Sequence, residues 1–272
     1  MRSKRPSWPQ SDGCDHRRSD RCQMTMRLTI VGCGDAFGSG GRFNTCFRID
    51  AKQAAILLDC GASSLVALKA RHIDLNVIDA IMLSHLHGDH FGGLPFLLLD
   101  AQLLSRRTRP LVIAGPPGTR ARLDAALEVF FPRSTSTAWH FAWKVQEIVP
   151  GRPSELLGLT VETIEVEHPS GAPSTAVRLG DGERVLAYSG DTQWTDALLS
   201  IGRNADLFIV ECYEYVRDIA YHMNWNVLRS RLADLGAKRV MITHLGPAML
   251  AQAEVAQAAG VLVACDGAVV EI

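Results

Sequence analysis

Short apolar runs alternate with longer amphipathic stretches along most of this chain. Apolar runs bounded by Gly, Pro or polar residues predict strands, whereas stretches with apolar residues three and four positions apart predict helices. In the first two thirds, this pattern predicts helices at Ser63–Arg71, Gly93–Ser105 and Gly118–Phe130. It predicts strands at Leu28–Cys33, Phe47–Ile49, Ala54–Leu58, Ala80–Ser84, Leu111–Ala114, Val145–Val149, Leu159–Val166, Thr175–Leu179 and Arg184–Tyr188.

The last third repeats the alternation. It contains the predicted helices Thr195–Gly202, Trp225–Leu235 and Ala248–Ala259, and the predicted strands Leu207–Val210, Arg239–Ile242 and Val261–Ala264. Strand-rich stretches edged by helices favour an α/β architecture in which sheets pack on each other and helices lie outside. No repeat or linker interrupts the pattern, so we expect a single domain over residues 24–272.

The N-terminal segment differs from the rest of the chain. Residues 1–23 are polar, contain Arg and Pro, and show no periodicity, which predicts a disordered extension. A translation start at Met24 or Met26 instead of Met1 would remove it. Residues 1–22 hold six basic and three acidic groups; removing them from the totals of 28 and 29 leaves 22 and 26, a net charge of −4. This balance disfavours a dedicated nucleic-acid binder, which carries a basic field.

Composition narrows the class of protein further. A chain of 272 residues with 47% hydrophobic residues can bury a substantial core. Its seven cysteines are odd in number and show no framework spacing, which favours free thiols in a reducing cytoplasm. No apolar run reaches the roughly 18 residues that span a membrane, and the basic N-terminus lacks the apolar segment of a signal peptide.

The strongest chemical signal is a cluster of metal-binding residue types at Ser84–His90. Directly after the apolar run Ile81-Met82-Leu83, the chain reads His85-Leu86-His87-Gly88-Asp89-His90. Imidazole and carboxylate groups are ligands that suit zinc and its neighbours. Four such groups at this spacing have no packing rationale, so we expect a strand that ends in a turn and directs them into one pocket.

Three further candidate ligands follow predicted strands. They are His168, Asp191 and His244, and each stands at a strand end with Gly or Pro within two residues. Seven ligands exceed the four that a structural zinc ion takes, whereas two metal ions sharing one carboxylate would use them all. We therefore expect one metal at His85, His87 and His168, a second at Asp89, His90 and His244, and Asp191 as the bridge. The ligands suit zinc first, with manganese and iron as alternatives. Two such ions would hold a hydroxide that is nucleophilic at neutral pH.

Together these residues resemble the metallo-β-lactamase superfamily from about Arg27 to the C-terminus. The resemblance implies a four-layer αβ/βα sandwich with a dimetal site along one edge of the paired sheets. Class B β-lactamases usually carry Cys where Asp191 stands, and redox di-iron members carry Glu where His87 stands. The resemblance therefore disfavours both antibiotic hydrolysis and redox chemistry.

Two more positions resemble the phosphodiesterase branch that includes ribonuclease Z. Glu211 ends the run Ala205–Glu211, and His222 lies in Tyr221-His222-Met223-Asn224-Trp225. The resemblance implies that His222, oriented by Glu211, protonates the leaving oxygen, and that Asp89 assists a proton transfer while it binds metal. A purely structural alternative for His222 is a helix-start residue that caps or packs.

Departures from ribonuclease Z point to a small substrate. Ribonuclease Z carries a long Gly-, Pro- and basic-rich arm that grips tRNA, whereas ordinary strands and helices account for residues 100–167 here. The resemblance therefore favours a small phosphodiester, such as a cyclic nucleotide or nucleotide fragment, and disfavours large structured RNA. Related hydrolases often dimerise, which leaves a homodimer open. Aromatic residues near His222 suit either base stacking or the core: Trp194, Tyr213, Tyr215, Tyr221 and Trp225.

The remaining alternatives concern one loop and the reaction class. The Gly-rich loop Gly38–Arg42 with Asn44 is either a phosphate-binding loop that uses Arg42 or a plain turn. A carboxylic ester, lactone or thioester hydrolase on the same dimetal core is the alternative to a phosphodiesterase. A noncatalytic binding module is the third hypothesis, and the complete set of seven ligands disfavours it.

Overall fold

The computed structural model describes residues 26–272. The predicted disordered extension at residues 1–23 and the alternative start Met24 lie outside the described residues. Met26 lies inside them, fully buried, and its carbonyl accepts a hydrogen bond from the amide of Ile272.

Within residues 26–272, fourteen strands form two seven-stranded sheets. The first has the order β14-β1-β2-β3-β4-β5-β6, with β1 (Arg27–Gly32), β2 (Cys46–Asp50), β3 (Ala55–Leu58), β4 (Ala80–Met82), β5 (Leu111–Gly115), β6 (Trp143–Glu147) and β14 (Val269–Glu271). The second has the order β13-β12-β11-β10-β9-β8-β7, with β7 (Ser154–Leu156), β8 (Leu159–Glu165), β9 (Thr175–Gly180), β10 (Val185–Tyr188), β11 (Leu207–Glu211), β12 (Val240–Thr243) and β13 (Leu262–Val263).

Each sheet combines an antiparallel part with a parallel part. In the first sheet, β14, β1, β2 and β3 pair antiparallel, and β3 to β6 pair parallel. In the second, β7 to β10 pair antiparallel, and β10 to β13 pair parallel. Strands β8, β10, β11 and β12 therefore run in one direction, so the residues that follow them emerge at the same edge.

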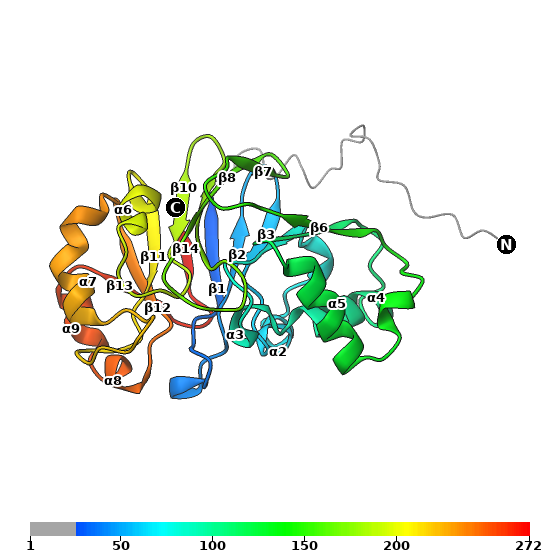
Figure 1. Ribbon diagram of the computed structural model, residues 1–272, viewed down its shortest axis with the longest axis horizontal. Helices are drawn as coiled ribbons and strands as arrows, with labels where there is room; N and C mark the ends of the chain where they lie inside the picture. The colour runs from blue at the N-terminus through cyan, green and yellow to red at the C-terminus, as the bar shows by residue number, and fades with distance from the viewer. Residues whose placement is uncertain (1–25) are drawn as a thin grey trace.

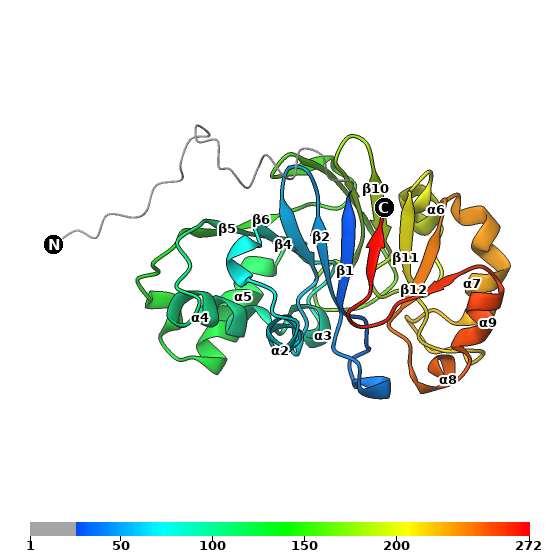
Figure 2. The same cartoon turned by 180° about the vertical axis from the view of Figure 1, so that it is seen from behind.

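Helices cover the outer face of each sheet. The helices are α2 (Ser64–Ala70), α3 (Gly88–Phe91), α4 (Leu94–Leu103), α5 (Thr119–Phe130), α6 (Ala197–Gly202), α7 (Trp225–Arg231), α8 (Pro247–Leu250) and α9 (Ala253–Ala258), with 3-10 turns η1 (Ser39–Gly41), η2 (Leu75–Val77), η3 (Ser134–Ser136) and η4 (Leu232–Leu235). In Figures 1 and 2, α4 and α5 lie on one flank of the molecule, and α6, α7 and α9 lie on the opposite flank.

Three apolar clusters fill the spaces between these layers. The first lies between the two sheets, where the rings of Phe47 on β2 and Tyr188 on β10 meet edge to face at 5.7 Å. A second cluster joins the first sheet to its helices, and a third joins the second sheet to its helices. Two sheets between two helical layers form a four-layer αβ/βα sandwich, which confirms the predicted fold class.

The structure differs from the predicted elements at several places. Strands β7 and β14, each three residues long, were not predicted, and neither was the four-residue helix α3. Strand β14 returns the chain to β1, with Glu271 paired to Arg27. The helix predicted at Ala248–Ala259 is two short helices, α8 and α9, which separate at Ala251 and Gln252.

Other sequence expectations concern cysteines and membranes. The five cysteines within residues 26–272 are free thiols, and four of them are buried. Across the described residues, no helix combines the length and the apolar character needed to cross a membrane.

Candidate metal centre

The predicted ligands meet where strands of both sheets end. His85 follows β4 of the first sheet after two residues, and Asp89 and His90 lie on the short helix α3. From the second sheet, His168, Asp191 and His244 follow β8, β10 and β12, whose carboxyl ends share one edge. The turns after these parallel strands thus deliver side chains that are far apart in sequence to one place.

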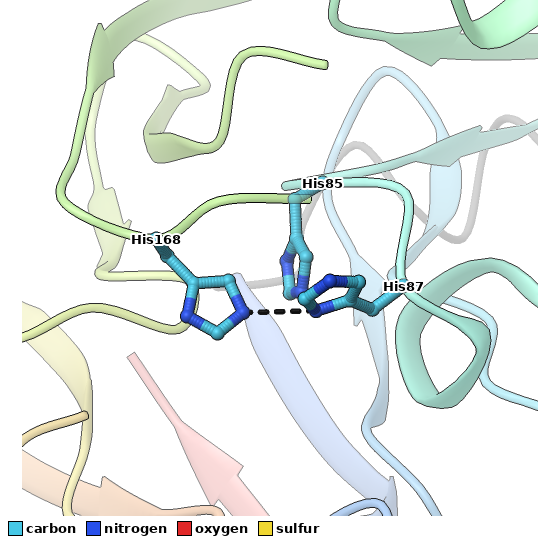
Figure 3. Close-up of side chains that lie close together, drawn as sticks. All are labelled: His85, His87 and His168. Carbon is cyan, nitrogen blue, oxygen red and sulfur yellow. Dashed lines mark hydrogen bonds between the residues drawn. The ribbon is translucent and has the colours of Figure 1, made fainter. Parts of the chain in front are cut away.

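The first group of ligands consists of three imidazoles. His85, His87 and His168 present one ring nitrogen each, and these nitrogens lie within 4.8 Å of one another. Figure 3 shows the three rings turned toward a common point, with Nδ1 of His87 2.9 Å from Nε2 of His168. Imidazole nitrogens that converge in this way form a set of donors that suits a divalent metal ion.

The second group combines imidazoles with carboxylates. Asp89, His90, Asp191 and His244 again place their ligand atoms within 4.8 Å of one another. Nε2 of His90 lies 3.3 Å from Oδ2 of Asp89 and 3.2 Å from Oδ1 of Asp191. Ligand atoms about 2.0–2.1 Å from a tetrahedral zinc ion lie roughly 3.3 Å apart, so these separations match such a site.

Asp191 faces both groups. Its Oδ2 lies 3.9 Å from Nε2 of His85 and 3.9 Å from Nε2 of His168 in the first group. The same oxygen is 3.3 Å from Nε2 of His244, while Oδ1 approaches His90 in the second group. The carboxylate therefore occupies the position between the two groups that a bridging ligand requires.

Hydrogen bonds on the far side of two rings fix which nitrogen faces the centre. Nδ1 of His90 donates to the carboxylate of Asp59 over 2.7 Å, and Nδ1 of His168 donates to the carbonyl oxygen of Tyr221 over 3.1 Å. Both partners accept at these atoms, so the proton resides on Nδ1 and the Nε2 lone pair is directed at the centre. Such outer hydrogen bonds orient metal ligands and raise their basicity.

Backbone strain also marks the site. His244 has φ 60° and Asp59 has φ 60°, values that belong to the left-handed region and cost energy for residues with a side chain. The amide of His244 donates to the carbonyl of Cys33 over 3.1 Å, which holds this conformation. Strained residues that the surrounding structure holds in place cluster at functional sites.

Buried polar atoms test whether the site fits a cation. Nε2 of His85, Nε2 of His90 and Oδ1 of Asp191 are buried and have no hydrogen-bond partner. Each such orphan costs about 1–3 kcal/mol unless something satisfies it. A divalent cation would satisfy all three, so this donor set of imidazole and carboxylate fits a metal ion.

The protonation equilibria agree with this reading. Burial lowers the pKa of His85 well below its ordinary value and lowers that of His168 to about 4, so both rings are neutral. Burial acts in the same direction on His90, but the carboxylates of Asp191, Asp89 and Asp59 outweigh it and raise the pKa. This excess of negative charge around His90 marks a place that favours a positive charge.

Glu211 and His222 lie beside the second group. Nδ1 of His222 is hydrogen-bonded to the buried carboxylate of Glu211, and the ring stacks parallel to His244 with 6.0 Å between centroids. Ligand atoms of Glu211 and His222 lie within 4.8 Å of those of Asp191 and His244. Burial raises the pKa of Glu211, whereas the contact with Glu211 raises that of His222 against the effect of burial. The pair therefore retains a proton close to the centre.

The structure shows where Arg42 of the Gly-rich loop and the aromatic residues near His222 lie. Arg42 donates to the carbonyl of Ala264 over 3.1 Å and is thus tied to the C-terminal segment. Trp225 is fully buried in the core, and the Trp194 ring lies 5.4 Å from the guanidinium of Arg231. Only Tyr213 of the predicted aromatics places its ring by both His222 and His244, at 5.2 and 6.3 Å.

Comparison with known proteins places this geometry in a family. Over 227 residues the chain is 27% identical to YhfI of Bacillus subtilis, described as a probable metallo-hydrolase, covering 81% of this chain and 87% of YhfI. The crystal structure of YhfI, a metallo-β-lactamase fold protein, superimposes with a TM-score of 0.73 and 26% identity, covering 92% of this chain and 100% of YhfI.

Two further relatives are more distant. Ribonuclease Z of Mycobacterium bovis is 24% identical over 244 residues, which cover 82% of this chain and 87% of the enzyme. A diphosphatase of the PhnP family shares the fold with a TM-score of 0.72 at 19% identity, covering 91% and 98% of the two chains. The profile of the anti-Pycsar protein Apyc1 matches residues 26–265. The chain is a metallo-hydrolase with the metallo-β-lactamase fold, and it belongs to the Apyc1 family.

Proposed function

We propose that this protein is a dinuclear metal-dependent phosphodiesterase that acts on a small phosphodiester, such as a cyclic nucleotide. The observation that carries the proposal is His222, held by Glu211 beside the candidate metal ligands. A histidine backed by a carboxylate is an oriented proton donor, and a phosphodiester whose leaving group is an alkoxide needs one. The similarity to ribonuclease Z supports a phosphodiester as the bond that is cleaved.

The proposed site residues are of two kinds, metal ligands and residues that transfer protons. His85, His87 and His168 would hold one ion, Asp89, His90 and His244 the other, with Asp191 shared between them. Zinc is our first choice. When bound, two such ions supply charge neutralisation and a nucleophile near neutral pH.

The chain's own residues complete the reaction. His222 would give the proton on Nε2 to the leaving oxygen as the P–O bond breaks, which leaves a neutral alcohol and a neutral imidazole. Glu211 keeps Nδ1 occupied and stabilises the protonated ring. Asp89, whose Oδ2 lies 3.3 Å from Nε2 of His90, would assist a second proton transfer and would also be a ligand.

The preference for a small substrate rests on what surrounds the site. The segment between the first histidine cluster and His168 is occupied by α4, α5 and β5 to β8, with no long arm among these described elements. The body of the chain carries a net charge of −4, which does not favour a large polyanion.

Turnover of defined substrates tests the proposal. The purified protein, loaded separately with zinc and manganese, is assayed with bis(p-nitrophenyl) phosphate, 3′,5′-cyclic AMP, a tRNA precursor, an aryl lactone and a thioester. We expect metal-dependent cleavage of the first two. Cleavage of the lactone or thioester alone, in protein shown to hold two metal equivalents, would replace the phosphodiesterase with an ester or thioester hydrolase.

A further inference from the structure

The residue before His222 has an unusual backbone conformation. Tyr221 has φ 68°, in the left-handed region that side-chain-bearing residues avoid. The residue is 44% exposed, so packing of the phenol ring does not explain the conformation. Something other than burial must hold the Tyr221 backbone, and through it the start of His222.

The amide of His222 donates to the carbonyl of Ile219 over 3.1 Å, which closes a turn around Tyr221, and two further polar contacts hold Tyr221 itself. The amide of Tyr221 donates to Oε1 of Gln193 over 3.1 Å. The carbonyl oxygen of Tyr221 accepts from Nδ1 of the candidate ligand His168 over 3.1 Å. Gln193 and His168 reach Tyr221 from different loops, so its two backbone polar groups are clamped between them.

Gln193 has no evident packing role. It is exposed, and it lies two residues after the candidate ligand Asp191. It also lines a cavity of about 250 Å³ whose walls include Trp194, Asp218 and His222. Because this cavity is open to water, replacing Gln193 by a side chain that lacks a hydrogen-bond acceptor would not force the core to repack.

From this geometry we infer that Gln193 is a positioning residue for His222, acting through the Tyr221 peptide that it clamps against His168. The inference rests on the proposed function, because it assigns Gln193 to the proton donor of that reaction. Glu211 fixes the far nitrogen of the ring, and the clamp fixes the backbone from which the ring projects. Both are needed to hold Nε2 at a constant position.

Two substitutions separate the hydrogen bond from the side-chain volume. Gln193→Met keeps the length but removes the acceptor, and Gln193→Glu keeps an oxygen that accepts from the Tyr221 amide. Gln257→Met, on the exposed face of α9, is the matched control. Hydrogen exchange of the Tyr221 amide and the melting temperature are measured first, because neither depends on turnover. Of the three variants, we expect only Gln193→Met to show faster exchange of the Tyr221 amide, and we expect its melting temperature to be unchanged.

Turnover is then compared between two leaving groups. The ribose alkoxide of 3′,5′-cyclic AMP needs a proton, whereas p-nitrophenolate leaves without one. We expect Gln193→Met to lower kcat for the cyclic nucleotide by roughly 10- to 100-fold, with KM and nitrophenyl ester turnover little changed. Gln193→Glu restores kcat, and in a His222→Ala background Gln193→Met has no further effect, because it acts through His222.

The outcomes separate the two proposals. Unchanged exchange of the Tyr221 amide in Gln193→Met, or equal losses for both leaving groups, overturns the positioning role while the phosphodiesterase stands. Wild-type protein that holds two metal equivalents and cleaves no phosphodiester overturns the proposed function, and the exchange data then report only the backbone clamp.

Discussion

The carboxylate of Asp59 accepts a 2.7 Å hydrogen bond from Nδ1 of His90, and both residues are completely buried. Asp59 also accepts from the amide and the hydroxyl of Ser84, at 2.7 and 2.8 Å. One side chain thus orients a ligand on α3 and anchors the turn that starts the first histidine cluster. Asp59 would thus support the candidate metal centre without being a ligand itself.

Replacing Asp59 by Asn should lower metal affinity more than it lowers the stability of the fold. The amide keeps the size but loses the charge that makes His90 a better ligand, so we expect metal affinity to fall by about 10- to 100-fold. Competition with a chelating dye measures it. Asp50→Asn is the control, because Asp50 is also a buried aspartate but pairs with Arg27 and Arg48. Equal metal affinity in Asp59→Asn and wild-type protein would show that the outer hydrogen bond is dispensable.

Replacing His222 by Ala should lower turnover and spare the metals. Positioned proton donors contribute typically 10²- to 10⁴-fold, so we expect a loss of kcat of that order for alkyl leaving groups. Metal content by plasma emission spectrometry should stay near two equivalents, because His222 is not one of the seven predicted ligands. A variant with full phosphodiester turnover would contradict the assigned role.

Replacing Asp191 by Ala should affect both metal positions together. Asp191 lies within 3.9 Å of nitrogens from both groups, so its loss removes a donor from each. Metal that binds only the folded state stabilises it, and we therefore expect lower metal content and a lower melting temperature. His87→Ala provides the comparison, with loss confined to one group. Two retained equivalents at an unchanged melting temperature would rule out the bridging position.

Replacing two glycines beside the first cluster by alanine should change the free energy of unfolding by different amounts. A Cβ on Gly61 would lie 2.0 Å from the carbonyl oxygen of Asp89, whereas a Cβ on Gly88 would meet nothing within 4 Å. We expect Gly61→Ala to cost about 1–3 kcal/mol or more, because backbone must move, and Gly88→Ala to stay within about 0.5 kcal/mol of wild type. Urea unfolding of metal-free protein measures both. A tolerated Gly61→Ala would mean that the α3 turn is not fixed against β3.

The alternation of strands and helices predicted the layers, the dense cluster predicted four candidate ligands, and strand ends predicted the other three. Parallel strands place their carboxyl ends together, so His168, Asp191 and His244, each at a predicted strand end, could be grouped before their contacts were known. The apolar runs were long enough to predict most strands. The structure brings the seven ligands together, and their role as ligands stays a proposal that the substitutions above test.

The supporting residues could not be predicted in this way. Asp59 contacts His90, which is 31 positions away, and Gln193 contacts Tyr221, which is 28 positions away. A single carboxylate after a strand, or a single glutamine in a loop, is too common to signal such a role. The left-handed backbone conformation of Tyr221 could not be predicted either, because tyrosine, unlike glycine or asparagine, does not favour it.

The candidate ligands come from both sheets, so bound metal ions would also act as a reversible cross-link. Ions held by His87 and His168, and by His90 and His244, would close loops of many tens of residues between the two halves of the chain. Closing long loops removes conformational freedom from the unfolded chain, much as a disulfide does. Unlike a disulfide, this cross-link opens when a chelator removes the ion, so metal supply would set the resistance of the whole sandwich to unfolding.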